Sequence, residues 1–244
     1  MPVSQRGQHE IAHGKKLSES NPEQIWGWGT PAGKIRSERR ARLISAAAGL
    51  EPGRRALEIG CGTGLFTEYF ARSAAQIVAL DISEELLASA RQRHLPETVT
   101  FVCSPFEALS ADEPFDAVIG SSVLHHLDIE SALSHIHRLL KPGGVMSFAE
   151  PNMLNPQIMI QKNIPWVKAR MGDSPDETAF FRWRLAAQMR KVGFCNIEII
   201  PLDWLHPAIP PALIDIVQKT GGLFEKLPLL REIAGSLYIR GSRS

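Results

Sequence analysis

The chain has 244 residues, of which 44% are hydrophobic and 22% are charged, values that are ordinary for a globular protein in water. Its 27 Lys and Arg residues nearly balance 26 Asp and Glu residues, so the net charge favours neither nucleic acid nor an anionic membrane as a partner. No apolar run approaches the roughly 18 residues of a membrane-spanning helix, and the N-terminus has no apolar signal-peptide core. We therefore expect a cytoplasmic protein.

Three cysteines, Cys61, Cys103 and Cys195, lie far apart and form no CxxC pair or Cys/His cluster. This spacing predicts neither a disulfide framework nor a zinc site, and we expect no metal. Each cysteine lies in or beside an apolar run, which is typical of buried thiols in a reducing compartment.

Residues 1–36 are polar and rich in Gly, Pro and Asn, which predicts a loop-like N-terminal arm or lid that can include short helical pieces. Trp26 and Trp28 lie within it, either folding over a ligand or docking onto the rest of the protein. Residues 37–244 are expected to form a single domain whose first helix spans residues 37–48. The cations of "RSERRAR" (36–42) are expected on a solvated face of this helix.

From residue 56 onwards, apolar runs of strand length alternate with amphipathic helical segments. The alternation predicts an α/β protein with a parallel sheet that helices cover on both faces. The strands are expected at 56–61, 76–82, 99–104, 116–122 and 145–150, with two more at 195–202 and 235–241.

Two stretches, at about 152–173 and 206–233, interrupt the alternation as cap-like insertions. Between them, Ser174, Pro175 and Glu177 have the form of a capping box, which predicts a helix that ends at Gly193. The insertions either wall an apolar pocket or complete the core or a dimer face. An apolar pocket would suit a hydrophobic acceptor, with peripheral lipid contact as one version.

The stretch "LEIGCGTG" (57–64) ends the first strand with Gly60, Gly62 and Gly64. In an open parallel sheet, ligands bind beyond the carboxyl ends of the strands, and glycines let the backbone approach them closely. The spacing G-x-G-x-G differs from the dinucleotide motif G-x-G-x-x-G, and Glu58 would repel a pyrophosphate but attract an ammonium group. Asp81 ends the second strand and can accept hydrogen bonds from both hydroxyls of a ribose. These requirements together describe S-adenosylmethionine.

Four motifs, "LEIGCGTG", "ALDIS", "FDAVIGSSVLHHL" and "LLKPGGVMSFAEP", resemble successive motifs of the class I S-adenosylmethionine-dependent methyltransferases of the type 11 kind. The resemblance covers about residues 55–151. It implies a Rossmann-like, doubly wound, seven-stranded sheet, mostly parallel with the last strand antiparallel. It also implies that the glycines pass under the methionine moiety, Glu58 anchors its amino end, Asp81 holds the ribose and Ile82 packs on the adenine.

After the third strand the family often has an aspartate for the adenine amino group, where this chain has Pro105. The backbone amide of Phe106 is then the expected adenine contact, with Glu107 as a replacement for the acid. The implied cofactor-binding residues are Glu58, Gly60, Cys61, Gly62, Gly64, Asp81, Ile82, Phe106, Gly120 and Ser121.

His125 and His126 follow the fourth strand, and Glu150 ends the fifth. A histidine–carboxylate pair fits a general base that deprotonates a hydroxyl acceptor. We expect His126, or else His125, to be the base with Glu150 as its partner, and O-methylation of a small molecule as the reaction. The alternatives are N- or C-methylation of a small or lipid-linked substrate, and a scaffold that binds S-adenosylmethionine without catalysis. Nucleic acid is not expected as a substrate, and the oligomeric state is not predicted.

Overall fold

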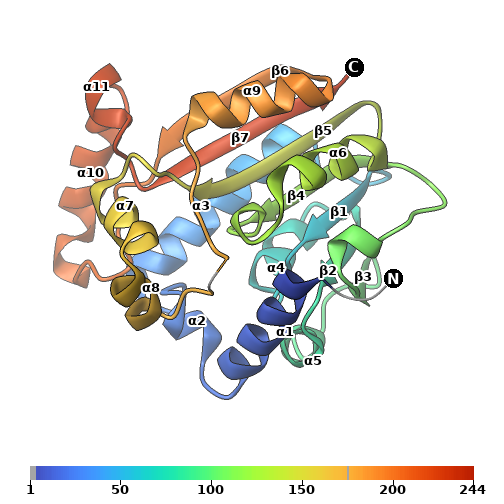
Figure 1. Ribbon diagram of the computed structural model, residues 1–244, viewed down its shortest axis with the longest axis horizontal. Helices are drawn as coiled ribbons and strands as arrows, with labels where there is room; N and C mark the ends of the chain where they lie inside the picture. Colours follow the sequence, from blue (N-terminus) through green and yellow to red (C-terminus); the bar gives the residue numbers. More distant parts are fainter. Residues whose placement is uncertain (1–3, 175) are drawn as a thin grey trace.

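The computed structural model describes residues 4–174 and 176–244, and Figure 1 shows its arrangement. Seven strands form one sheet in the order β3-β2-β1-β4-β5-β7-β6, in which β7 is antiparallel to both of its neighbours and the other pairs are parallel. This topology confirms the predicted fold class. In chain order the strands are β1 (Arg55–Ile59), β2 (Gln76–Asp81), β3 (Val99–Cys103), β4 (Phe115–Ser121), β5 (Leu140–Pro151), β6 (Phe194–Leu202) and β7 (Ser236–Arg243).

Strand β1 lies near the middle of the sheet because its apolar residues are buried on both faces. Leu57 is fully buried and is opposite Val78 of β2 on one side and Val118 of β4 on the other. The strand order reverses between β1 and β4, which makes the carboxyl end of β1 the topological switch point, where ligands bind in open α/β sheets.

Helices cover both faces of the sheet. One core contains residues of α3, α4 and α5, and the other contains residues of α6 and α9. The bounds of these helices are α3 (Pro31–Ala48), α4 (Leu65–Ala71), α5 (Glu84–Arg91), α6 (Ile129–Leu139) and α9 (Arg182–Val192).

The N-terminal arm is mostly helical, so its helix content exceeds the short helical pieces that the predicted loop-like segment allowed. It contains α1 (Gln5–Ser18) and α2 (Pro22–Ile25), and α3 begins at Pro31 rather than at residue 37. The Oγ1 of Thr30 accepts a hydrogen bond from the Gly33 amide at 3.0 Å and so caps α3. Gly27, Gly29 and Gly33 had suggested a loop, but they allow the arm to fold back tightly on itself and on the next helix.

The helix predicted to follow a Ser174 cap begins seven residues later, at Arg182, with Phe181 as its N-cap. The amide of Ser174 does donate to Glu177 Oε1 at 2.7 Å, but the Ser174 hydroxyl donates to Glu10 instead of returning to this turn. Half of the capping box is therefore present without a helix, because Glu177 is drawn into a buried ion cluster. Pro175, the predicted first helical residue, lies outside the described residues.

Two thiols are exposed, against expectation. Cys61 is buried, whereas Cys103 and Cys195 are exposed. Cys103 ends β3 and Cys195 lies in β6, and these are the two edge strands of the sheet. An apolar sequence context does not bury a side chain on a strand that has a neighbour on one side only.

The two insertions are helical and lie together at one side of the molecule (Figure 1). Residues 152–173 form α7 (Pro156–Asn163) and α8 (Pro165–Met171), and residues 206–233 include α10 (Ile214–Phe224) and α11 (Pro228–Arg231). Within the described ranges, no helix is both long and apolar enough to cross a bilayer.

Candidate active site

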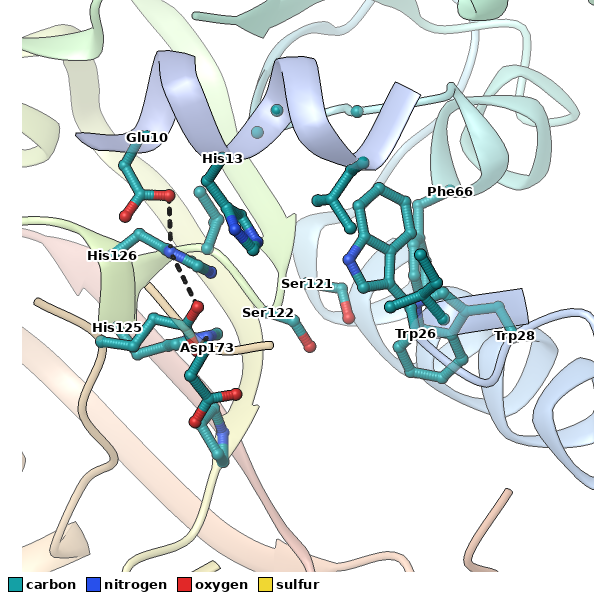
Figure 2. Close-up of a pocket in the computed structure, with 18 of the residues that line it drawn as sticks. Glu10, His13, Trp26, Trp28, Phe66, Ser121, Ser122, His125, His126 and Asp173 are labelled. Atoms are coloured by element: carbon teal, nitrogen blue, oxygen red, sulfur yellow. Dashed lines mark ion pairs between the residues drawn. The ribbon is translucent and has the colours of Figure 1, made fainter. Parts of the chain in front are cut away.

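A cavity of about 640 Å³ lies at the carboxyl ends of the parallel strands. This volume is within the range of small-molecule sites. Its floor comes from the loops after β1, β2, β3, β4 and β5, and its walls come from α1, the α2–α3 turn, α7 and the segment after β6. Figure 2 shows its side chains, with histidines and acids at one end and Trp26, Trp28 and Phe66 at the other.

The glycine turn after β1 has a conformation that a larger residue could not adopt without strain. Gly60, Gly62 and Gly64 have φ values of +67°, +52° and +77°. A Cβ on Gly60 would lie 2.4 Å from Val123 Cγ2, so this glycine also makes room for the loop that carries the histidines. Gly60, Cys61 and Gly62 line the cavity. The turn thus exposes bare backbone to a ligand.

Asp81 stands at the end of β2 and lines the same cavity. Its Oδ2 accepts from the Gly62 amide at 2.7 Å and its Oδ1 accepts from the Ser83 amide at 2.9 Å. These bonds fix the carboxylate against the glycine turn and leave each oxygen one further lone pair for a ligand hydroxyl. Burial nevertheless raises the pKa of Asp81 above its ordinary value, because the two amides do not fully replace water.

Glu58 lies below the turn, 1% exposed, and does not line the cavity. Its Oε2 has no hydrogen-bond partner among the described residues. Burial raises its pKa to about 8, with the nearby Asp81 charge adding to the shift. An alternative for Glu58, an ion pair with Arg55, is not formed, because that guanidinium packs over the ring of Phe115. A buried carboxyl with a free oxygen fits a site whose cationic ligand completes it.

His125 and Glu150 form a buried pair that holds the histidine loop. Glu150 Oε2 lies 2.7 Å from His125 Nδ1, and its Oε1 accepts from the amides of Val123 and Leu124 at 2.9 Å each. Burial raises the pKa of Glu150, but His125 and the amides outweigh it, so the net pKa is low and the group is ionised. Burial, followed by the charge of His126, lowers the pKa of His125. Glu150 does not line the cavity.

Of the two expected pairings, the structure forms the one between Glu150 and His125, and the preferred base His126 has other carboxylate partners. His126 Nδ1 lies 2.9 Å from Glu10 Oε2 and 3.8 Å from Glu177 Oε1 (Figure 2). The 2.9 Å contact is a charge pair that is not aligned as a hydrogen bond. Burial lowers the pKa of His126, but Glu10 and then Glu177 outweigh it, so the net pKa is raised. His126 can therefore change its charge near neutral pH.

A second charged cluster surrounds Glu177. Lys162 Nζ lies 2.5 Å from Glu177 Oε2 and 2.7 Å from Asp173 Oδ2, with only 7% of the lysine side chain exposed. His125, His126 and Glu177 also offer three ligand atoms within 4.8 Å of one another, an arrangement that could hold a metal ion. Lys162 already neutralises the Glu177 carboxylate, so we interpret the cluster as an acid–base network.

The remaining predicted site residues divide by their position. Ile82, Phe106 and Ser121 line the cavity, as does Glu107. Gly64 and Gly120 do not. A Cβ on Gly120 would lie 2.8 Å from Phe148 Cε1 and 2.9 Å from the Ile59 carbonyl oxygen, so packing within the sheet accounts for this glycine.

The arm closes over the glycine turn. Trp26 and Trp28 line the cavity, and Trp28 packs edge-on against Phe66 at 5.5 Å between ring centroids. The Thr63 hydroxyl donates to Glu23 of α2 at 3.0 Å, which ties the arm to the turn.

The cations of 36–42 do not share one solvated face, contrary to expectation. Arg40 is 2% exposed, and its Nε lies 2.7 Å from Asp203 Oδ2, while Arg36 Nε lies 3.1 Å from the same oxygen. All three residues line the cavity. Arg40 also donates to the Ser122 hydroxyl at 3.1 Å, so α3 supports the loop that carries the histidines.

Sequence patterns gave no signal for Glu10, Lys162 or Asp203 as site residues. Glu10 lies in a polar segment with no apolar periodicity, and Lys162 lies in an insertion without a motif. The sequence pattern predicts that Glu177 caps a helix. Its place beside the two histidines depends on the fold and has no local signal in the sequence.

Comparisons with known proteins agree with this geometry. Residues 57–148 match a family model described as a methyltransferase domain. The chain is 36% identical over 120 residues to a protein named ubiquinone biosynthesis O-methyltransferase from Rhodopseudomonas palustris (strain HaA2), covering 47% of this chain and 45% of the relative. The chain thus spans about half the length of the curated relative that it matches.

Solved structures share the whole architecture. The N-methyltransferase NodS from Bradyrhizobium japonicum WM9, in complex with S-adenosylhomocysteine, has a TM-score of 0.65 at 16% identity and covers 96% of this chain and 97% of its own. The [4+2]-cyclase SpnF has a TM-score of 0.66 at 20% identity, with 100% and 98% covered. At these identities the likeness shows the fold alone, and a fold hosts more than one chemistry.

Proposed function

Because residues 57–148 form a methyltransferase domain within the class I methyltransferase fold, we propose that this protein transfers a methyl group from S-adenosylmethionine to an oxygen of a small molecule. One observation carries the proposal: a single cavity joins the glycine turn, Asp81 and His126. A nucleoside site and a titratable base therefore face the same enclosed space.

The cofactor site is built from the first two strands. The backbone of Gly60 and Gly62 would pass under the methionine moiety, and Asp81 would accept hydrogen bonds from the ribose hydroxyls. Glu58, with one unpaired oxygen, would attract the ammonium group from below the turn. Ile82 and Phe106 would enclose the adenine, and Trp26 would cover the site, since an aromatic face attracts a sulfonium.

S-adenosylmethionine would supply an electrophilic methyl carbon, so the protein's main tasks are alignment and proton removal. The acceptor hydroxyl gives its proton to His126 as its oxygen bonds to the methyl carbon. The carbon–sulfur bond breaks with both electrons on sulfur, which leaves neutral S-adenosylhomocysteine, and His126 later releases the proton to water. Glu10 and Glu177 stabilise the imidazolium that forms, while His125 and Glu150 hold the loop.

The acceptor is proposed to be amphipathic. Near His126 the walls are polar, with Gln161, Lys162 and Asp173 available to hold hydroxyl or carbonyl groups. Farther out, Ile158 and Met171 offer apolar contacts. Of the apolar 206–233 insertion, only His206 and Pro207 line the cavity, so that insertion contributes little to the acceptor site.

The relative named for ubiquinone biosynthesis and the NodS structure favour small-molecule acceptors but differ in the atom methylated. N-methylation is the second candidate, since an amine needs a base less than a hydroxyl does. The third candidate is a reaction other than methyl transfer, because the [4+2]-cyclase SpnF has a similar fold.

The test is turnover of S-adenosylmethionine with a panel of phenols, hydroxyl acids and amines, followed by S-adenosylhomocysteine release. We expect a hydroxyl substrate, with H126N at least about 100-fold slower at unchanged cofactor affinity. Turnover is expected to survive EDTA. Full activity of H126N would contradict the base, and cofactor binding without turnover of any acceptor would favour a scaffold.

A further inference from the structure

The carboxylate beside the proposed base comes from α1, the N-terminal helix. Glu10 of α1 lies 2.9 Å from His126 Nδ1, 116 positions away in the sequence. The Ser174 hydroxyl donates to the other oxygen, Glu10 Oε1, at 2.5 Å. Only 15% of the Glu10 side chain is exposed, so it points inward rather than to solvent.

Helix α1 is held in place at both ends of the cavity. Arg6 Nη1 donates to the carbonyl oxygens of His126 at 3.2 Å and Leu127 at 2.8 Å. At the other end a Cβ on Gly14 would lie 2.7 Å from Ser83 Cβ, so the helix backbone rests directly on Ser83, two residues beyond the end of β2. The helix therefore spans the cofactor end and the base end of one cavity.

We propose that Glu10 is a positioning residue, which holds the proton of neutral His126 on Nδ1 and leaves the lone pair of Nε2 to deprotonate the acceptor. A neutral imidazole has one donor and one acceptor nitrogen, and the partner of one decides the role of the other. This inference rests on the proposed function of His126 as the base. The two groups need only a small realignment, as is common for catalytic hydrogen bonds before substrate binds.

Several charged groups act on His126 from the elements packed around it. Glu10 and Arg6 come from α1, and Glu177 comes from the segment after α8. The others are His125 on the loop after β4, Asp81 and Glu150 at the ends of β2 and β5, and Lys162 and Asp173 behind Glu177. Among them Glu10 stabilises the imidazolium form of His126 most, ahead of Glu177. It raises the pKa of His126, whereas burial lowers it.

The experiment is a ¹H–¹⁵N NMR titration of the histidine rings with S-adenosylhomocysteine present as the probe ligand. The His126 signals are those missing from H126N. In the wild type we expect neutral His126 to carry its proton on Nδ1. In E10Q we expect its pKa to fall by about 1 to 3 pH units, the effect of losing a carboxylate at this distance. The matched control is H9Q, because His9 Nδ1 ties α1 to Asp176 at 2.7 Å without touching His126.

A wild-type proton on Nε2, or an E10Q variant with an unchanged His126 pKa, would overturn the positioning role. The same fall in H9Q would also overturn it, because any loosening of α1 would then suffice. The wild-type tautomer decides even if E10Q does not fold. A negative result for Glu10 would not contradict the role of His126 as the base, because that role is tested by the turnover of H126N. Conversely, a fully active H126N would show that His126 is not the base, whichever tautomer it adopts.

Discussion

Glu58 is an acid that the fold buries while one of its carboxyl oxygens has no hydrogen-bond partner among the described residues. It has a pKa of about 8. A buried acid with a raised pKa destabilises the folded protein as pH rises, because the unfolded chain ionises first. Its contribution is fully present below the ordinary pKa and is lost as pH rises towards 8. A buried acid whose shifted pKa lowers the free energy of unfolding is typical of functional sites.

We therefore predict that E58Q flattens the pH dependence of stability without ligand. Between pH 5 and pH 8 the wild type should lose free energy of unfolding relative to E58Q, by on the order of 3 kcal/mol. Urea unfolding across this range measures the difference, in which all other titrating groups cancel. With S-adenosylmethionine bound, the order should reverse at pH 8. Parallel curves for the two proteins would show that the carboxyl is not strained.

The adjacent histidines His125 and His126 pair with different carboxylates. The two rings lie side by side at 4.2 Å between centroids and both line the cavity, yet His125 pairs with Glu150 and His126 with Glu10. The sequence placed all three predicted residues at the right strand ends but could not say which carboxylate served which ring. Side-chain direction after a strand depends on the local turn, here a single 3-10 turn from Leu124 to His126.

Among the helices, α3 makes buried ion pairs that its amphipathic pattern did not suggest. Its Arg36 and Arg40 meet Asp203, which follows β6, inside the molecule. Burial raises the pKa of Asp203, but the arginines outweigh it and bring the pKa to about 2. The ion cluster joins α3 to the end of a distant strand and supports the histidine loop through Ser122. Charge spacing alone could not reveal this, because the partner lies 163 positions away.

Removing the acid should leave two buried guanidinium groups unpaired. We predict that D203N lowers the free energy of unfolding at pH 7 by about 3 to 5 kcal/mol. Because the folded pKa is depressed, the stabilisation is present above about pH 4 and disappears as pH falls through 2. The gap between variant and wild type, measured by urea unfolding, should therefore narrow towards pH 2.

The control is D215N, which changes an exposed acid on α10 and should cost less than about 0.5 kcal/mol. An equal loss in both variants, or a gap that does not depend on pH, would contradict the cluster.

At the scale of the whole molecule, the fold was predictable and the closure of its site was not. Near-continuous apolar strands, glycine turns and capped helices each favour one local structure, and together they fix the sheet from β1 to β5. The arm and the two insertions lack such agreement between local signals. Their placement depends on polar contacts across the chain, such as Glu10 with Ser174 and Lys162 with Glu177. Those residues close the cavity, so its floor at the strand ends was predicted better than its walls.

Exposed apolar side chains remain on both insertions. Large apolar side chains of the second insertion are exposed, including Leu229 at 87%, and Trp166 of α8 is 70% exposed. Apolar side chains beside the basic residues Lys168 and Arg170 suit a membrane interface. We predict flotation with anionic liposomes and its loss in L223E/L229E. A wild type that stays with the sedimented protein, with or without cofactor, would contradict lipid contact.

We propose above all that the cavity beside Asp81 and the glycine turn accepts a nucleoside that carries an amino acid. Isothermal titration of S-adenosylhomocysteine tests it most directly, with D81N as the matched variant. We predict one binding site per chain, an affinity loss of about tenfold or more in D81N, and no heat with NAD. Binding of NAD in place of S-adenosylhomocysteine, or no binding of S-adenosylhomocysteine at all, would contradict it.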